Sequence, residues 1–90
     1  MKRYGALGLV EVEGEANGVL ITDQMLKAAD VTYITHDTKC GGHALIFISG
    51  SVSAVSAAVE SVVGNPPCKV LNSAVIPSPS EETFKVMEEL

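Results

Sequence analysis

Apolar and polar positions change in short blocks along this chain, and the blocks predict four strands and three helices. Strands are expected where apolar residues alternate with polar ones or run unbroken between turn residues, at 4–13, 31–36, 44–49 and 69–76. Helices are expected where apolar residues recur at about 3.6-residue spacing, at 16–29 and 52–63. A third, short helix is expected to begin after Ser80 and to reach Leu90, because Ser80 suits an N-cap and acidic residues follow it.

The order of these elements is β-α-β-β-α-β with a short C-terminal helix, which is the split βαβ arrangement of ferredoxin-like α/β (α+β) folds. The strand at 44–49 is almost wholly apolar, which favours a central position in the sheet. Gly-Asn-Pro-Pro at 64–67 and Pro-Ser-Pro at 77–79 end the second helix and the last strand. Many unrelated activities use this architecture, so function has to come from particular residues.

The apolar positions of the two longer helices also predict which faces meet the core. In 16–29 the near-helical spacing involves five residues, namely Val19, Leu20, Met25, Leu26 and Ala29. Asp23 precedes Lys27 by four residues and should form a surface pair, whereas Gly18 weakens the helix. In 52–63 the predicted core face is made of valines, namely Val52, Val55, Val59, Val62 and Val63, and Ser51 is the expected N-cap.

Length and composition indicate one domain over residues 1–90 whose core is made of small, branched side chains. The chain is 47% hydrophobic but only 4% aromatic, and it contains twelve valines. A domain of this size buries only about 60–65% of the surface that its unfolded chain exposes, so its stability alone is marginal. Such chains often complete their core by self-association.

Charge and hydropathy exclude several classes of partner. With a net charge of −5 and only six Lys and Arg, the chain lacks the basic stripe that nucleic-acid binding requires. No apolar run approaches the roughly 18 residues that cross a bilayer, and Glu11 and Glu13 interrupt the apolar stretch that follows Met1 before it resembles a signal peptide. We therefore expect no membrane association, a reducing cytosolic setting and free thiols at Cys40 and Cys68.

Four segments, in order, resemble the bacterial microcompartment shell domain, the unit that tiles into the protein walls of polyhedral metabolic organelles. They are ALGLVE at 6–11, DQMLKAADV at 23–31, GSVSAV at 50–55 and VIPSP at 75–79. Each segment alone is weak, but together they stand at nearly the family spacing across positions 6 to 82 and cover most of the chain. The resemblance implies a structural shell protein of the bacterial cytoplasm.

In that family, identical domains form cyclic hexamers, and the loop between strands two and three lines a narrow central pore. The resemblance therefore implies pore-lining roles for Lys39, Cys40, Gly41 and Gly42. Cys40 stands where glycine is common and Gly41 where a pore-lining serine often sits, which departs from a pore for ordinary polar metabolites. At the hexamer edge, Lys27 matches the lysine through which hexamers pack side by side in a layer. Ser78 replaces an arginine that commonly packs there, which predicts weaker or differently specific lateral assembly.

Cys40 is the candidate metal ligand, because its turn needs the freedom of the neighbouring glycines but has no use for a thiol. Six copies around a pore would form a ring of sulfurs, and some members of the family carry an iron–sulfur cluster through a loop cysteine. The resemblance thus implies a cluster, 4Fe–4S in type, shared between protomers. Such a cluster takes four thiolates, so sixfold symmetry would have to be broken. The alternative is that Cys40 is a small buried hydrophobe.

Other polar residues favour structural explanations. His43 follows Cys40 by three residues and could complete a zinc pair, but strand residues alternate in direction and its ring need not face the pore. We expect Cys68 to pack in the core, and Glu11 and Glu13 to lie on an exposed sheet face rather than to act as paired acid and base. No phosphate-binding, metalloprotease or Ser-His-Asp pattern is present in the sequence, so we do not expect an enzyme.

The leading hypothesis is thus a homohexameric shell protein that packs with other shell proteins around encapsulated enzymes, with a cluster at Cys40 for electron transfer or gating. By resemblance to shell proteins with unusual pore cysteines, the compartment would be one built around a glycyl-radical enzyme. One alternative keeps the shell role and makes the pore a passive metabolite channel. The other is a small cytosolic metal-binding or regulatory module of the ferredoxin-like kind, working as a dimer.

Overall fold

The computed structural model describes residues 5–38 and 42–88, and the expected order of elements is confirmed within them. Within these residues, each element begins and ends within one residue of its predicted range. The predicted start of the first strand at Tyr4 and the predicted end of the last helix at Leu90 lie outside the described residues. The elements are β1 (Ala6–Glu13), α1 (Glu15–Ala28), β2 (Thr32–Asp37), β3 (His43–Gly50), α2 (Val52–Gly64), β4 (Val70–Ile76) and α3 (Glu81–Glu88). None of the helices described is long and apolar enough to span a membrane.

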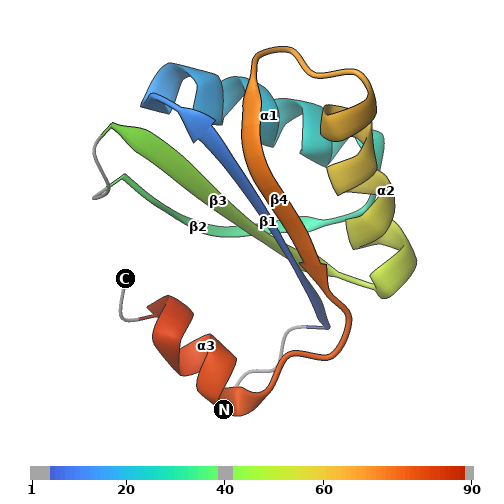
Figure 1. Ribbon diagram of the computed structural model, residues 1–90. Coiled ribbons are helices and arrows are strands. Elements are labelled where there is room, and N and C mark those ends of the chain that lie inside the picture. The colour runs from blue at the N-terminus through green and yellow to red at the C-terminus, as the bar shows by residue number, and fades with distance from the viewer. Residues whose placement is uncertain (1–4, 39–41, 89–90) are drawn as a thin grey trace.

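The four strands form one sheet in the order β2-β3-β1-β4, and all neighbouring strands are antiparallel. This is the ferredoxin-like topology, and β3 has a central position, as its apolar run predicts. Helices α1 and α2 cover one face of the sheet, whereas α3 lies on the opposite side (Figure 1). The strands β2 and β4 are therefore the two edges of the sheet.

The main core lies between α1, α2 and the sheet, and it corrects the predicted face of α1. The buried residues of α1 are Gly18, Ile21 and Met25. Val19, Leu20 and Leu26, expected to face the core, instead expose 68%, 50% and 43% of their surface. The helix carries apolar side chains on more than one side, so its periodicity alone could not select the face that meets the sheet.

The predicted face of α2 is confirmed in its centre and wrong at its ends. Val55, Val59 and Val62 are buried in the core, whereas Val52 and Val63 expose about half of their surface. The side chain of Ser51 accepts a hydrogen bond from the backbone N–H of Ala54 at 3.1 Å, so the predicted N-cap is confirmed.

A second, smaller cluster lies on the other face of the sheet, beneath α3. Phe84 and Met87 of α3 pack against Leu7 of β1 and Phe47 of β3. The start of α3 is capped as predicted, because Ser80 Oγ accepts a hydrogen bond from the backbone N–H of Thr83 at 3.2 Å. The sheet is consequently buried on both faces at the end where α3 lies.

A glycine allows α2 to approach β1 closely. A Cβ atom added at Gly8 would lie 2.8 Å from Val55 Cγ1 and 2.9 Å from Ile48 Cγ1, closer than real Cβ contacts permit. Val55 and Ile48 are both fully buried. A residue with a side chain, which a strand would normally prefer at this position, is excluded because the space in front of Gly8 is already filled.

Candidate functional site

The loop between β2 and β3 is where the sequence places the pore-lining residues. Lys39, Cys40 and Gly41 lie outside the residues that the structure describes, so their predicted roles stay predictions. Gly42 is exposed and has a φ of 86°, a left-handed conformation that suits glycine. Its carbonyl accepts a hydrogen bond from the backbone N–H of Gly14 at 2.7 Å. The base of the loop is thereby tied to the junction between β1 and α1.

A polar cluster of Glu11, His43 and Asn72 crosses three strands at this end of the sheet. His43 Nδ1 donates to Glu11 Oε2 at 3.0 Å, and Asn72 Nδ2 donates to Glu11 Oε1 at 2.8 Å. The flanking residues Val10 and Val12 belong to the main core, so Glu11 lies on the sheet face away from α1 and α2.

The Glu11 carboxylate is held in its charged form by these partners. Hydrogen bonds from Asn72, and then from His43, lower the pKa of Glu11 below its ordinary value of 4.5. The side chain of Glu11 exposes only 24% of its surface. The expectation of a simple exposed carboxylate is therefore wrong for Glu11, whereas Glu13 is exposed as expected.

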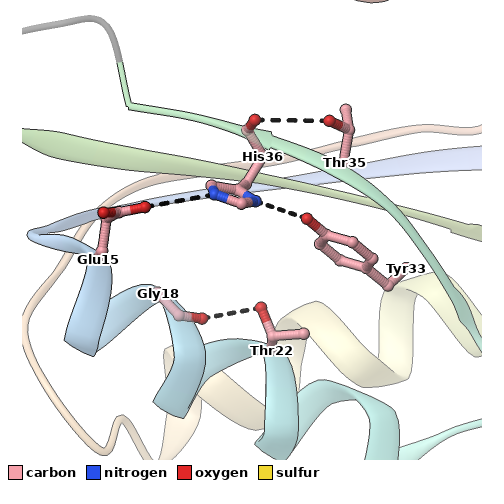
Figure 2. Close-up of polar contacts among 6 residues, drawn as sticks. All are labelled: Glu15, Gly18, Thr22, Tyr33, Thr35 and His36. Atoms are coloured by element: carbon pink, nitrogen blue, oxygen red, sulfur yellow. Dashed lines mark hydrogen bonds and ion pairs between the residues drawn. The ribbon is translucent and has the colours of Figure 1, made fainter.

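A second polar cluster joins α1 to the edge strand β2, on the helix-covered face of the sheet. His36 Nδ1 lies 2.5 Å from the Tyr33 hydroxyl, and His36 Nε2 lies 3.5 Å from Glu15 Oε1. Figure 2 shows the ring of His36 between these two side chains, above α1. These two contacts place the imidazole of His36 beside the first turn of α1.

The residues of this second cluster also line a groove between α1 and β2. The groove encloses about 370 Å³, and its floor is formed by Gly18, Ala44 and Ile46. Val19, Leu26 and the ring of Tyr33 form apolar walls, while acidic and imidazole groups stand at the rim. Thr22 at its wall bonds back to the carbonyl of Gly18 at 2.8 Å, so its hydroxyl is already satisfied within α1.

The sequence matches the family described as BMC domain over residues 6–79, which is most of the chain. The chain belongs to the BMC domain family. It is 36% identical over 61 residues to a carboxysome shell protein of Hydrogenovibrio crunogenus, covering 67% of this chain and 64% of that protein. It is 34% identical over 80 residues to the bacterial microcompartment shell protein EutK of Salmonella typhimurium, covering 87% of this chain and 49% of that protein.

The fold comparison agrees with this assignment. A crystal structure of a microcompartment protein from Desulfitobacterium hafniense superposes with a TM-score of 0.76 and 31% identity, covering 89% of this chain and 44% of that one. The chain spans between 44% and 64% of the length of these three proteins. The expected family and BMC-type fold are therefore confirmed.

The lysine predicted at the edge of this BMC domain is placed on the surface at the end of α1. Lys27 Nζ lies 2.8 Å from Asp23 Oδ2, so the predicted surface pair is confirmed. The hydrogen bond to Asp23, and then its charge, raises the pKa of Lys27. Ser78 is exposed after β4. A role for Lys27 between hexamers stays a prediction.

Cys68 packs partly buried against the main core, as the sequence analysis expects. Burial raises the pKa of its thiol, which disfavours the thiolate that metals bind. Over residues 5–38 and 42–88, no group of three or more His, Cys, Asp or Glu side chains is placed to hold a metal ion. The residues that the structure describes therefore offer no ligand set to an iron–sulfur cluster, and any site for such a cluster depends on Cys40.

The two polar clusters were not predicted from the sequence. Glu11 and Asn72 are 61 residues apart, and only the register between β1 and β4 makes them neighbours. Glu15 and His36 meet because α1 packs beside β2. The sequence shows these carboxylates and histidines, but no local sequence pattern indicates which residues become neighbours across a sheet.

Proposed function

We propose that this chain is a structural shell subunit of a bacterial microcompartment. The observation that carries the proposal is the BMC match over residues 6–79, together with relatives that are themselves named as microcompartment or carboxysome shell proteins. The role is to build a wall rather than to catalyse a reaction. Its setting is the microcompartment shell, in a layer with other shell proteins around encapsulated enzymes.

The subunits of this wall form a closed homohexamer with the β2–β3 loops around a central pore. Self-association is supported by the apolar side chains that α1 leaves in solvent, Val19, Leu20 and Leu26. A domain of this size also gains from a core completed by its neighbours. The proposed pore residues are Lys39, Cys40, Gly41 and Gly42.

The mass of the particle in solution tests the ring. Light scattering coupled to gel filtration should give about six chain masses for a closed cyclic assembly. A monomer or dimer at micromolar concentration would contradict the shell role and favour the alternative of a small cytosolic module.

The proposal extends to an iron–sulfur cluster at the pore, held by Cys40 from several protomers. It is supported by the chemistry of the donor, because thiolates are the usual ligands of such clusters, and by the packing of Cys68 against the core, which makes Cys40 the better candidate of the two cysteines. When bound, the cluster would supply one-electron transfer or gating at the pore. Anaerobic reconstitution followed by iron and sulfide analysis separates this from a passive metabolite pore.

A further inference from the structure

The groove between α1 and β2 lies along one flank of the domain and is left open. Its walls include Val19, Leu26 and Tyr33, which expose 68%, 43% and 38% of their surface. Strand β2 is an edge of the sheet, and its outer side pairs with no strand in the part of the chain that the structure describes. An apolar groove beside an unpaired edge strand is a surface that proteins usually cover.

The groove carries negative charge at the end nearest the β2–β3 loop. Glu15 stands at its rim, with its side chain 71% exposed, and faces His36. The other carboxylate at the groove, Asp23, is already paired with Lys27. No lysine or arginine within residues 5–38 and 42–88 forms an ion pair with Glu15. A cation from outside the subunit would therefore complete this end of the groove.

The opposite flank of the domain offers such a cation. Lys69 is exposed and immediately precedes β4, the other edge of the sheet. Val70 pairs with Val12, so Lys69 lies at the same end of the sheet as the junction between β1 and α1. Among the ion pairs of the described residues, none involves Lys69. Glu15 and Lys69 are thus at the same end of the sheet but on opposite edges.

We propose that the α1–β2 groove of one subunit receives the β4 edge of the next copy of this chain, with Lys69 placed against Glu15 and His36. The proposal rests on the proposed ring. When identical subunits converge with their loop ends on one axis, each presents one flank to the opposite flank of its neighbour, and such a head-to-tail contact closes into a ring. Opposite charges at the same end of the two flanks fix the register of that contact.

Charge reversal on each flank tests the contact. Lys69→Glu and Glu15→Lys should each shift the particle from about six chain masses towards one, because each places like charges opposite one another. The combined variant, Lys69→Glu with Glu15→Lys, restores the opposite pairing and should recover the ring. Lys85→Glu is the matched control, since Lys85 is exposed on α3, away from both flanks, and should leave the ring intact. Circular dichroism of every variant checks that the subunit itself is folded.

The outcomes separate this contact from the shell role. A wild-type chain that forms no ring overturns the proposed function and the contact with it. A wild-type ring that survives both single reversals, or a combined variant that does not recover it, overturns the contact and leaves the ring standing.

Crosslinking supplies an independent measurement on the unmodified protein. A carbodiimide joins a lysine amine directly to a carboxylate, so it traps only groups in contact. In a ring assembled from ¹⁴N-labelled and ¹⁵N-labelled chains, a Lys69–Glu15 crosslink should join peptides of different label. Absence of that mixed-label peptide from crosslinked rings would contradict the contact.

Discussion

A methyl group added at Gly8 should destabilise the subunit, because the space in front of this residue is already occupied. The new Cβ of Gly8→Ala would lie within 3.0 Å of Val55 Cγ1 and Ile48 Cγ1, and a third atom, Ile48 Cδ1, is 3.2 Å away. Both neighbours are fully buried, one in α2 and one in the central strand β3. Relief therefore requires that the buried side chains of Val55 and Ile48 shift from their packed positions, with α2 moving away from the sheet to make room for Val55.

The magnitude follows from two opposing effects. Forcing an extra methyl into a filled core costs about 1–3 kcal/mol, whereas replacing glycine restricts the unfolded chain and returns about 0.4–1 kcal/mol. The difference between these ranges is about 0–2.6 kcal/mol. Because two contacts would be shorter than 3.0 Å, we expect Gly8→Ala to lie in the upper part, lowering the free energy of unfolding by about 1–2.5 kcal/mol. In a domain of this size, each kcal/mol corresponds to about 4–8 °C in Tm.

The matched control is Gly64→Ala, at the exposed last residue of α2. A Cβ there meets no atom within 4 Å, so the substitution keeps the entropic gain and improves helix propensity. Urea unfolding at one fixed chain concentration should show a lower midpoint for Gly8→Ala and an equal or higher midpoint for Gly64→Ala.

A second substitution tests the cause of the loss. Val55→Ala removes the Cγ1 atom that the new methyl would meet, so Gly8→Ala should cost less in that background than in the wild type. If Gly8→Ala is as stable as Gly64→Ala, or costs the same in both backgrounds, then the close packing of α2 on β1 is not what requires glycine.

Three further outcomes are expected. The pKa of Glu11 lies below 4.5 because the amide and the imidazole that bond it favour the charged form, so its contribution to stability is present above that pH and lost as the pH falls through the lowered pKa. Glu11→Gln should therefore show a smaller loss of urea midpoint on acidification past 4.5 than the wild type does, and an equal loss would contradict this coupling. Lys27→Ala should leave thermal unfolding nearly unchanged, because Lys27 is an exposed end-of-helix residue, but should reduce the sheets or tubes seen by electron microscopy of the assembled protein; unaltered sheets would place the lateral contact elsewhere. Cys40→Ser should abolish bound iron and sulfide after anaerobic reconstitution, since a hydroxyl is a poor ligand for a cluster, while Cys68→Ser should retain them; equal iron in both variants would leave the pore as a passive opening.

The element order was predictable because its boundaries are marked by residues with a local physical role. Ser51 and Ser80 cap helices with their side chains, as their types indicate. Proline-containing turns end α2 and β4 near the predicted positions. The unbroken apolar run of β3 correctly indicated a strand inside the sheet. Each of these signals acts over a few residues, so the sequence carries it directly.

The orientation of α1 and the polar clusters were not predictable in the same way. Val19, Leu20 and Leu26 are as apolar as the buried Ile21 and Met25, so composition could not tell a face meant for the sheet from one left in solvent. The hydrogen bonds that join Glu11, His43 and Asn72 depend on how three strands align. Such information becomes available only once the register of the sheet is known.

The hydrogen bond from Gly14 to the carbonyl of Gly42 has a consequence for how this scaffold can diversify. It fixes the base of the β2–β3 hairpin from outside the hairpin, by a backbone contact of 2.7 Å that no side chain at 39–41 supplies. The three residues between Thr38 and Gly42 can therefore be replaced, in evolution or by design, without loss of the hydrogen bond that holds the base of the hairpin. We expect loops transplanted from other family members to be accepted here as long as glycine is kept at positions 14 and 42, where φ is positive.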